Sequence, residues 1–331
     1  MIITKTPYRI SFLGGGTDHP SWYKKYGGSV LSTTINKYCY VTCRYLPPYF
    51  KETHRIVYSK VELTSHTNEI EHPLIRESIK HANIKGGLEI HHQGDVPGWS
   101  GVGTSSSFTV GLLKAFYALK GRMVDSRKLA LDAIKVEQKK VKDTVGSQDQ
   151  VAASFGGLNR IDFLPNGKIN VNPVILLPKR LSDFQNHLLL FFTGIVRRSS
   201  DIEKEKVATF PQKKETLIKM AGMVDKGVKI LKNGDLNDFG KLMHEAWMLK
   251  KTFSSQISNS EINKLYNGAL QAGAIGGKLL GAGGGGFFLL FVSPGKHRAV
   301  RNKMKQLNFM EVPFKFESEG SKIIFYNSNL I

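Results

Sequence analysis

Cysteine is scarce in this chain of 331 residues, which contains only Cys39 and Cys43. A zinc site would need a second pair of ligands at a suitable spacing, and none follows these two. Four positions apart on a strand, the two side chains share a face, but their Cα atoms are too distant for a disulfide. We therefore expect two reduced cysteines that pack in the core.

Long hydrophobic runs are also missing. The longest, 188–192 and 287–292, are far shorter than the ~20 residues that a membrane helix needs. The N-terminus lacks the apolar centre of a signal peptide. With 41% hydrophobic and 22% charged residues, the composition is typical of a soluble globular protein. We predict a cytoplasmic location and no membrane partner.

Acidic residues are few: the chain has 27 of them and 47 lysines and arginines, which gives a net charge of +20. Such an excess is found in nucleic-acid-binding proteins. The lysines, however, are spread along predicted helices, as at Lys139, Lys140, Lys213 and Lys214, rather than gathered in one arm. We therefore predict a basic solvated surface and no nucleic-acid partner. An anionic small-molecule substrate is compatible with this charge.

The length and the hydrophobic periodicity predict two α/β halves. In the first half we expect strands at 29–35, 38–45 and 87–92, and helices that begin near 105, 126 and 147. In the second half, a strand at 188–192 precedes helices at 200–209, 212–232, 236–253 and 259–272. A strand at 287–292, a helix opened by Ser293 and Pro294, and strands at 312–316 and 322–326 complete the chain.

Glycine is abundant and forms clusters at 14–16, 101–103 and 281–286. The last cluster satisfies the pattern G-x-G-x-x-G, but it follows a helix and leads into a strand. The dinucleotide-binding fingerprint needs the opposite order, a strand, a turn and then a helix. No cluster ends in the Gly-Lys-Ser/Thr of a Walker loop. Both of these nucleotide-binding loops are therefore excluded.

The middle cluster has the context of a phosphate site. A predicted strand leads through Pro97 into the loop, and an amphipathic helix begins at about Ser105. Glycines let the backbone approach a phosphate, and a helix N-terminus offers free N–H groups and a partial positive charge. The hydroxyls of Thr104, Ser105 and Ser106 suit phosphate oxygens or magnesium. The alternative is that Ser105 only caps the helix.

Three acidic residues occupy unusual positions. Glu137 continues an apolar helical row, where a carboxylate is costly unless it is paired or bound to a metal; alternatively, it lies at the edge and reaches a lysine. Asp149 falls in the first turn of a helix that Ser147 and Gln150 would open as a capping box, where acids are common for structural reasons. Asp18 follows three glycines and either binds a polyol or stabilises the turn.

These segments, in this order, resemble the GHMP kinase family, which includes galactokinases and the homoserine, mevalonate and phosphomevalonate kinases. Its three motifs correspond to PYRISFLGGGTD at 7–18, PGWSGVGTSS at 97–106 and KLLGAGGGG at 278–286. The resemblance implies an α/β (α+β, two-layer) fold with an N-terminal ribosomal-protein-S5-like domain over 1–176. A C-terminal ferredoxin-like domain would span 177–331, with the active site between the two.

The resemblance also implies ATP and Mg²⁺ and gives roles to single residues. Asp149 would be the catalytic aspartate, and Arg9 would stabilise its ionised form and the transferring phosphoryl group. Ser105 and Glu137 would be magnesium ligands. The residues that bind ATP would be Pro97, Trp99, Gly101, Val102, Gly103, Thr104, Ser105 and Ser106. The residues that bind the substrate would include Gly16, Thr17, Asp18, Gly283 and Gly284.

A phosphate on the substrate would need a basic partner. Arg197 and Arg198 follow Thr193 and Gly194 at the end of the predicted strand 188–192. Strand ends open toward binding sites in α/β folds, so Thr193, Arg197 and Arg198 are candidates by position. The alternative is that the arginines are an ordinary surface pair.

The first motif reads Gly-Gly-Gly-Thr-Asp at 14–18, where galactokinases have Gly-Glu-His-Thr-Asp, so their Glu and His contacts to galactose are absent. In the second motif, Thr104 and Ser106 stand where Ser and Ala are usual. The first motif looks like that of D-glycero-D-manno-heptose 7-phosphate kinases and L-fucose kinases. The short chain favours the heptose branch.

The implied reaction is phosphorylation of the anomeric hydroxyl of D-glycero-D-manno-heptose 7-phosphate to the 1,7-bisphosphate, for the synthesis of nucleotide-activated heptose. One alternative is a 1-kinase for L-fucose or another unphosphorylated sugar. An alternative from another class is a basic nucleic-acid-binding S5-like module. A homodimer is compatible with the sequence, which does not indicate an oligomeric state.

Overall fold

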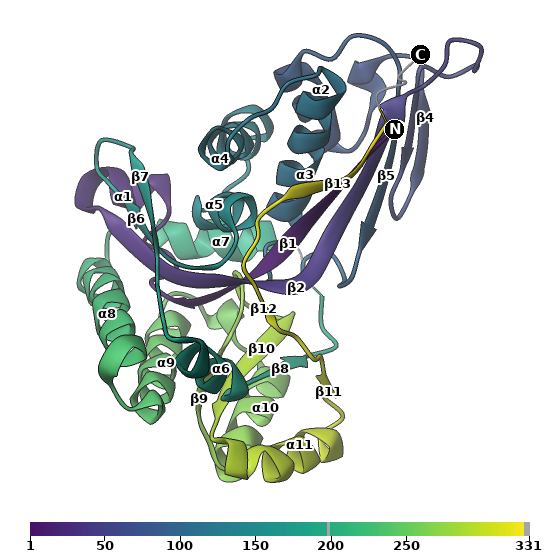
Figure 1. The fold of residues 1–331 in the computed structure, drawn as a ribbon. Helices are drawn as coiled ribbons and strands as arrows, with labels where there is room; N and C mark the ends of the chain where they lie inside the picture. The colour runs from purple at the N-terminus through teal and green to yellow at the C-terminus, as the bar shows by residue number, and fades with distance from the viewer. Residues whose placement is uncertain (197–198, 328–331) are drawn as a thin grey trace.

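The computed structural model describes residues 1–196 and 199–327, whose strands form two sheets (Figure 1). The larger sheet has nine strands: β1 (Ile2–Leu13), β2 (Gly28–Tyr45), β3 (His54–Val57), β4 (Val61–Thr64), β5 (Leu88–Gly94), β6 (Leu158–Phe163), β7 (Ile169–Pro173), β12 (Phe316–Glu317) and β13 (Lys322–Tyr326). The smaller sheet has four strands: β8 (Leu188–Phe192), β9 (Ala274–Leu279), β10 (Phe287–Val292) and β11 (Met310–Glu311).

Helices lie between these strands in both halves of the chain. Those of the first half are α1 (Pro20–Tyr26), η1 (Thr67–Glu69), α2 (Pro73–Ala82), α3 (Thr104–Leu119), α4 (Ser126–Lys135), the π-helical segment η2 (Val136–Val141) and α5 (Gln148–Phe155). Those of the second half are α6 (Pro178–Asn186), α7 (Ser199–Ala208), α8 (Lys214–Asn233), α9 (Leu236–Lys251), η3 (Ser255–Ile257), α10 (Ser260–Gln271), η4 (Pro294–Lys296) and α11 (His297–Gln306).

The two strands predicted at 29–35 and 38–45 are a single long strand, β2. It pairs antiparallel with β1, and the register shifts where Pro7 lies opposite Tyr38 and Tyr8 lies opposite Ile35. Proline has no N–H to donate to the ladder, so a bulge at this point costs few hydrogen bonds. The periodicity therefore located both runs correctly but could not show that the strand continues across residues 36 and 37.

The C-terminal end of the chain returns to the larger sheet. Strand β12 pairs with β2, and β13 pairs with β1, so the N-terminal strand lies between β2 and the last described strand (Figure 1). The prediction of a strand at 312–316 is wrong, because the structure has only the two-residue strands β11 and β12 in this part of the chain. Pro313 interrupts this segment and cannot donate to a ladder. The division into 1–176 and 177–331 stays a prediction.

Helices cover both faces of the β1–β2 ribbon. Helices α3 and α5 pack on one face, and α8 packs on the other (Figure 1). Helix α3 is apolar nearly all round, and 13 of its 16 residues are buried. A helix without a polar face must be enclosed on all sides, so α3 lies in the core, between the sheet and α2, α4 and α5. Its first turn lies beside β1 and is partly exposed at Thr104 and Ser105, whereas the helix is enclosed from Ser106 onward.

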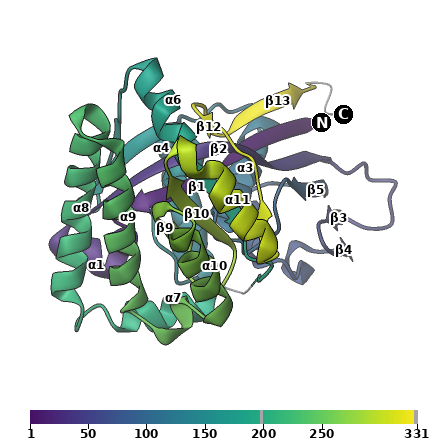
Figure 2. The same ribbon diagram turned by 90° about the horizontal axis from the view of Figure 1, so that it is seen from below.

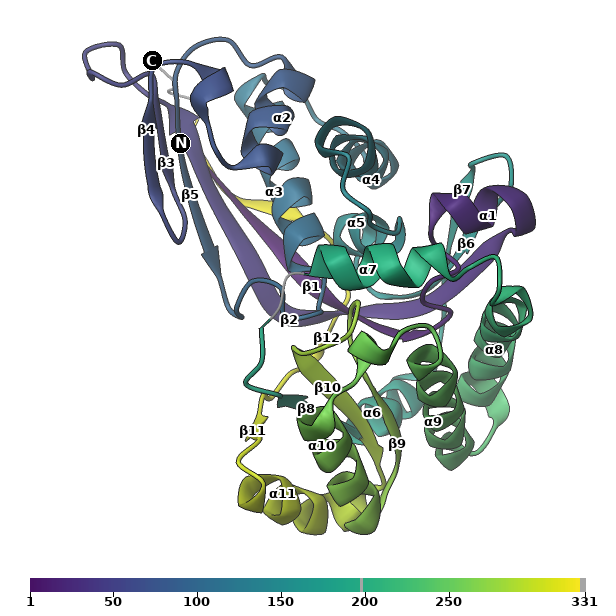
Figure 3. The same ribbon diagram turned by 180° about the vertical axis from the view of Figure 1, so that it is seen from behind.

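Helices α9 and α10 pack against β9, and α11 packs against α10 (Figure 2). The helix opened by Ser293 and Pro294 begins as the 3₁₀ turn η4 and continues as α11. Helix α7 runs across the junction between the two sheets, near the ends of α3 and α5 (Figure 3). No helix in the described residues is long and apolar enough to cross a membrane.

Cys39 and Cys43 are both free and buried, as predicted. Both lie on β2. Burial raises the pKa of both thiols, because a thiolate would lose its hydration in the core. The two cysteines are therefore protonated packing residues.

Candidate active site

The central glycine loop, residues 97–106, turns sharply into α3. Gly101 and Gly103 have φ angles of +85° and +79°, a left-handed conformation that glycine adopts without strain. Helix α3 begins at Thr104 with Gly103 as its N-cap, and no side chain caps it. The alternative that Ser105 only caps this helix is therefore wrong. The N–H groups of the first turn are not satisfied by a cap, as in an anion-binding helix N-terminus.

The other residues of this loop that we predicted to bind ATP differ in exposure. Pro97 and Trp99 are exposed, and the backbone N–H of Trp99 donates to Thr104 Oγ1 at 3.2 Å. Val102 is buried, and its carbonyl accepts a hydrogen bond from the Arg9 N–H at 3.0 Å. The loop is therefore anchored to β1 at Val102, while its outer part faces solvent.

The third glycine segment, residues 278–286, packs backbone to backbone against the central loop. A Cβ on Gly101 would lie 2.6 Å from the Leu280 carbonyl oxygen, and a Cβ on Gly281 would lie 2.5 Å from Gly101 Cα. The Phe287 N–H donates to the Ser100 carbonyl at 3.0 Å. Any side chain at these positions would separate the two segments. The glycines of this segment thus allow a close approach that holds the central loop in place.

Three residues near this contact that we predicted to bind substrate make close contacts with the backbone. The N–H and the hydroxyl of Thr193 both donate to the Gly286 carbonyl, at 2.9 and 2.8 Å. Gly284 donates its N–H to the Ile257 carbonyl, and a Cβ on Gly283 would lie 2.7 Å from Ile257 Cα. Their contact with a substrate stays a prediction. Arg197 and Arg198 lie outside the described residues.

Arg9 and Asp149 form a two-pronged ion pair beside this loop. Arg9 donates from Nε to Asp149 Oδ1 and from Nη2 to Asp149 Oδ2, each at 2.6 Å. Its Nη1 donates to the Gly101 carbonyl at 2.7 Å. The side chain of Arg9 is 5% exposed and that of Asp149 is 21% exposed. The predicted pair is thus assembled, and its carboxylate is the part that a ligand can reach.

Asp149 lies in the first turn of α5, as predicted, but the capping box does not form. Ser147 makes no capping hydrogen bond to α5. Its hydroxyl accepts instead from Gln138 Nε2 at 3.1 Å, and Gln150 Nε2 donates to Glu137 Oε2 at 2.9 Å. Both side chains turn toward η2 because buried polar groups there need partners. The local sequence favours a capping box, but in the folded protein Ser147 and Gln150 make tertiary hydrogen bonds in its place.

Glu137 is buried, with 1% of its surface exposed, so the alternative of an edge position that reaches a lysine is wrong. Its Oε2 accepts hydrogen bonds from Ser106 Oγ at 3.0 Å and from Gln150 Nε2 at 2.9 Å. Its Oε1 makes no hydrogen bond of regular geometry among the described residues, although the Thr109 hydroxyl lies near the carboxyl and acts to lower its pKa. Burial raises the pKa of this carboxyl to about 7. An unpartnered buried carboxylate oxygen is a feature that a cation would satisfy.

The hydroxyl that contacts Glu137 is that of Ser106, not that of Ser105. Successive side chains on a helix point about 100° apart, so only one of two adjacent serines can face a given partner. The chain also leaves the α-helical path here, because α4 continues as the π-helical segment η2 from Val136. Such segments are frequent at functional sites. The predicted helix over 126–142 is therefore continuous but not regular.

The first glycine turn, residues 14–18, is closed by its own side chains. Thr17 is fully buried, and its hydroxyl donates to the carbonyls of Gly14 and Ser29. Asp18 is 1% exposed, and its carboxylate accepts from the N–H groups of Gly16 at 2.9 Å and Gln148 at 3.3 Å. Asp18 thus stabilises the turn and ties it to α5. Contact of Asp18 with a substrate stays a prediction.

Buried lysines surround this turn, and the sequence analysis did not single them out. Lys206, Lys250 and Lys278 are each 6% exposed. Lys278 donates to the Phe12 carbonyl at 3.0 Å, and Lys250 donates to the carbonyls of Leu279 and Gly281. Burial lowers the pKa of Lys278 to about 7 and lowers that of Lys250 well below its usual value; nearby cations add to both effects.

Lys206 differs from the other two because it has a carboxylate partner. It donates to Glu203 Oε1 at 2.8 Å, and His19 Nε2 lies 2.6 Å from the same oxygen. Burial acts to raise the pKa of Glu203, but Lys206 and His19 outweigh it, so that this pKa is lowered. These contacts join α7 to the first glycine turn. No local pattern could have indicated them, because Glu203 and His19 are 184 residues apart.

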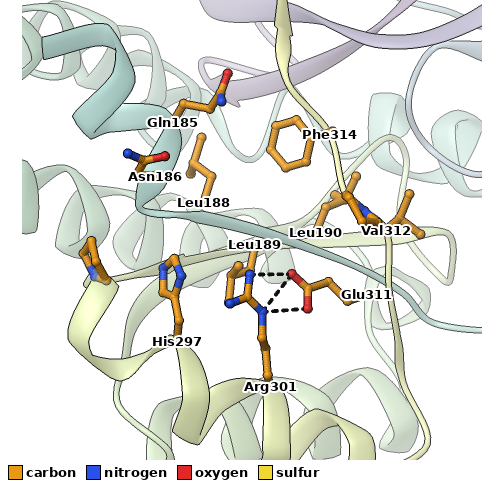
Figure 4. Close-up of a pocket in the computed structure, with 12 residues that line it drawn as sticks. Gln185, Asn186, Leu188, Leu189, Leu190, His297, Arg301, Glu311, Val312 and Phe314 are labelled. Carbon is orange, nitrogen blue, oxygen red and sulfur yellow. Dashed lines mark hydrogen bonds and ion pairs between the residues drawn. The ribbon is translucent and has the colours of Figure 1, made fainter. Parts of the chain in front are cut away.

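A separate hollow of about 350 Å³ lies between α6, β8, α11 and β11 (Figure 4). Its charged lining residues, Arg301 and Glu311, pair with each other through hydrogen bonds of 2.8 to 3.1 Å. Gln185 accepts from the Phe316 N–H at 2.7 Å. These polar groups are satisfied within the protein, and none belongs to the loops described above. This hollow is therefore separate from the candidate site that the glycine loops form.

The glycine loop at the uncapped N-terminus of α3 has the features of an anion-binding site. Comparison with known proteins identifies the family. Residues 70–157 match the model described as GHMP kinases N terminal domain, and residues 228–308 match GHMP kinases C terminal.

Relatives and solved structures agree with this match. The chain is 30% identical to D-glycero-alpha-D-manno-heptose 7-phosphate kinase of Campylobacter jejuni, across 97% of this chain and 98% of that protein. The bifunctional fucokinase/GDP-fucose pyrophosphorylase of Arabidopsis thaliana is 25% identical over 91% of this chain and 31% of its own length. The crystal structure of a D-glycero-D-manno-heptose 1-phosphate kinase from Bacteroides thetaiotaomicron superposes with a TM-score of 0.82, at 26% identity, covering 99% of this chain and 100% of that one.

The chain belongs to the GHMP kinase family. It is therefore an ATP-dependent phosphotransferase. The predicted fold class, with GHMP N-terminal and C-terminal domains, is confirmed. The family match therefore identifies the chain as a kinase rather than a nucleic-acid-binding S5-like module.

Proposed function

We propose that the chain transfers the γ-phosphoryl group of ATP to the anomeric hydroxyl of D-glycero-D-manno-heptose 7-phosphate. The observation that carries this proposal is the Arg9–Asp149 pair beside the central glycine loop. The choice of sugar is supported by the full-length similarity to a heptose 7-phosphate kinase. The Bacteroides protein is named a 1-phosphate kinase, so the two names differ in the position of the phosphate. The acceptor hydroxyl needs a direct test.

In the proposed reaction, the anomeric oxygen forms a bond to the γ-phosphorus while the bond from that phosphorus to the β–γ bridging oxygen breaks. ADP leaves, and Asp149 accepts the proton of the hydroxyl. Both Asp149 oxygens already accept from Arg9, but a carboxylate oxygen has a second lone pair for a substrate hydroxyl. The 21% exposure of its side chain leaves room for that contact.

Arg9 has two functions in this proposal. Its guanidinium orients the Asp149 carboxylate, because two parallel hydrogen bonds fix the plane of the carboxyl group. The guanidinium also lies beside the central loop, where it would offset negative charge on the transferring phosphoryl group. The hydrogen bond from Arg9 to the Gly101 carbonyl holds these two elements together.

The residues around Glu137 fit a magnesium ion. Its Oε1 is buried and without a partner, and Ser106 places a hydroxyl oxygen beside the same carboxylate. Carboxylate and hydroxyl oxygens are ligands that magnesium accepts, together with phosphate oxygens of the substrate. We propose that Glu137 holds the ion with Ser106 or its neighbour Ser105. A bound magnesium ion would neutralise charge on the ATP phosphates.

The experiment is an ADP-release assay over sugars with and without a terminal phosphate, followed by phosphorus NMR of the product. The proposal expects turnover with D-glycero-D-manno-heptose 7-phosphate and a product with a second, anomeric phosphate. Turnover with L-fucose or D-galactose, and none with the heptose phosphate, would overturn the substrate and favour the unphosphorylated-sugar alternative. That alternative has its own support in the fucokinase relative.

A further inference from the structure

The connection between β9 and β10 has almost no side chains of its own. Residues 281–286 are five glycines and Ala282. Gly281 and Gly284 have φ angles of +68° and +75°, which glycine adopts without strain. A glycine segment has many backbone conformations open to it and few side chains that could select one. Its conformation therefore depends on hydrogen bonds from other parts of the protein.

Lys250, in the last turn of α9, donates two such hydrogen bonds. Its Nζ lies 2.9 Å from the Leu279 carbonyl oxygen and 2.6 Å from the Gly281 carbonyl oxygen. Leu279 is the last residue of β9, and Gly281 lies two residues further along the chain. One amine thus joins the end of the strand to the start of the glycine segment. Lys250 thereby fixes the direction in which the chain leaves the smaller sheet.

That direction brings the glycine segment against the central loop. A Cβ on Gly281 would lie 2.5 Å from Gly101 Cα, so the two backbones touch with no side chain between them. No intervening side chain can rearrange to absorb a displacement of Gly281. The Gly101 carbonyl also accepts from Arg9, which binds Asp149. A shift of Gly281 would therefore reach both the loop before α3 and the Arg9–Asp149 pair.

Other hydrogen bonds to the carbonyls of this segment lie nearer to β10. Asn259 Nδ2 donates to the Gly284 carbonyl at 3.3 Å, and the Thr193 hydroxyl donates to the Gly286 carbonyl at 2.8 Å. These contacts join the segment to the rest of the C-terminal half. The contact of Lys250 differs from them because it lies at the glycine that touches the central loop.

The burial of Lys250 points to a function for its N–H donors. The residue is 6% exposed, and placing an amine in the interior is costly unless it is hydrogen-bonded. An apolar side chain would fill the same space without that cost. A charged amine has three N–H groups and a neutral amine has two, so either form can make both hydrogen bonds. The contact therefore does not depend on the protonation state.

We propose that Lys250 is a positioning residue for ATP, which acts through Gly281 to hold the central glycine loop in the conformation that binds the triphosphate. The role of that loop in binding ATP rests on the proposed function. Lys250 is not a catalytic residue, because its effect passes through the contact between Gly281 and Gly101.

The first test removes the donors and keeps the length of the side chain. Lys250→Met should lower kcat/KM for ATP by about tenfold to a hundredfold, since a displacement of about 1 Å can cost about 10²-fold in rate. KM for the sugar acceptor at saturating ATP should stay unchanged. Lys250→Gln, which retains an N–H donor, should lie between the wild type and Lys250→Met. Steady-state kinetics measure both substrates, and calorimetric titration with Mg²⁺ and ATP measures the nucleotide affinity without turnover.

The matched control is Arg180→Met. Arg180 in α6 also donates to backbone carbonyls, those of Ile230 and Leu231, at 2.7 and 2.9 Å. These carbonyls lie at the end of α8 and not in a glycine loop. Arg180→Met should lower the free energy of unfolding without changing KM for ATP. If it raised this KM as much as Lys250→Met does, lost stability would explain both results and the proposal would be overturned.

A double-mutant cycle with Gly101→Ala tests the route of the effect. If Lys250 acts through the contact with Gly101, Lys250→Met should raise KM for ATP much less in the Gly101→Ala background than in the wild type. Effects that multiply would show that Lys250 acts by another route and would overturn the proposal.

The same cycle separates the failure of this inference from that of the proposed function. If Gly101→Ala leaves the affinity for ATP unchanged, the central loop does not bind the nucleotide and the proposed site is wrong. If Gly101→Ala weakens ATP binding but Lys250→Met and Lys250→Gln do not, the site stands and only the role of Lys250 is overturned.

Discussion

Arg9 and Asp149 are joined by two parallel hydrogen bonds of 2.6 Å, although 140 residues separate them in the chain. The guanidinium comes from β1 and the carboxylate from the first turn of α5. A third hydrogen bond, from Arg9 to the Gly101 carbonyl, ties the pair to the central glycine loop. The pair is therefore held in position before any substrate binds, as electrostatic preorganisation requires.

Asp149→Asn tests the carboxylate of this pair. Asparagine has the same shape but cannot accept a proton or form both ion-pair hydrogen bonds with Arg9. We expect kcat to fall by about 10²- to 10⁴-fold, the usual range for loss of general base catalysis. Calorimetry should show that ATP binds with nearly unchanged affinity. Turnover close to that of the wild type would remove Asp149 from the catalytic role.

Glu137→Gln tests the proposed magnesium site. The amide replaces the carboxylate oxygen that has no partner by a group without negative charge, so the affinity for a hard cation should fall. We expect the Mg²⁺ concentration for half-maximal activity to rise by about tenfold or more. A titration of Mg²⁺ at saturating ATP measures this. An unchanged Mg²⁺ dependence would place the ion elsewhere.

Gly101→Ala tests the contact between the central loop and the third glycine segment. The new Cβ would lie 2.6 Å from the Leu280 carbonyl oxygen, at a residue with φ of +85°. The left-handed conformation alone costs a non-glycine residue about 1–2 kcal/mol, and the clash adds to this. We expect a lower free energy of unfolding and a higher KM for ATP, measured by denaturant titration and steady-state kinetics.

The control for this substitution is Gly222→Ala in α8. No atom lies within 4 Å of a Cβ there, and the residue is exposed on a helix. Alanine stabilises a helix relative to glycine by about 0.5–1 kcal/mol. Gly222→Ala should therefore unfold at a higher denaturant concentration with unchanged kinetics. Equal behaviour of Gly101→Ala and Gly222→Ala would contradict the packing that we describe.

The stability of the protein should depend on pH through Lys278. Burial lowers the pKa of its ammonium from 10.5 to about 7, so between these values the unfolded chain binds a proton that the folded chain does not. The cost of burying the charged lysine is fully present below pH 7 and disappears as the pH rises toward 10.5. The free energy of unfolding should gain up to about 1.4 kcal/mol per pH unit from this group in that window.

Lys278→Met removes this titration. The variant should be more stable than the wild type near pH 7, and the difference should shrink steadily toward pH 10. Denaturant titrations at half-unit pH intervals measure it, with the exposed Lys226→Met as a control that changes neither value nor slope. A constant difference across the window would show that Lys278 keeps its proton in the folded state.

Most of the fold could be predicted from local patterns. The helices α8, α9 and α10 and the strands β8 and β10 lie within a few residues of their predicted ranges, because each has a clear apolar period. The predicted break between residues 35 and 38 was wrong, because β2 continues there opposite the bulge at Pro7. The predicted strand at 312–316 was wrong at Pro313. Strand pairing is a long-range property, so a local pattern cannot show where a ladder continues or stops.

The candidate site residues could be predicted only where a short sequence motif or a local helical pattern contains them. The glycine loop at 97–106 and the acids Glu137 and Asp149 were named from the sequence and the family resemblance, and the structure brings Arg9 to Asp149 as expected. Ser106 instead of Ser105 faces Glu137, because side-chain direction depends on the rotation of α3 in its packed position.

The sequence by itself determined that the chain forms two α/β halves and carries a glycine loop immediately before a helix N-terminus. Backbone conformation and hydrophobic period are local properties, and the residues that set them are neighbours in the chain. Only the tertiary structure decided that Lys206 reaches Gly16, that Lys278 reaches the Phe12 carbonyl, and that Glu137 is buried with one free oxygen. Those contacts depend on how distant segments pack, because burial and charge arise between segments and not within them.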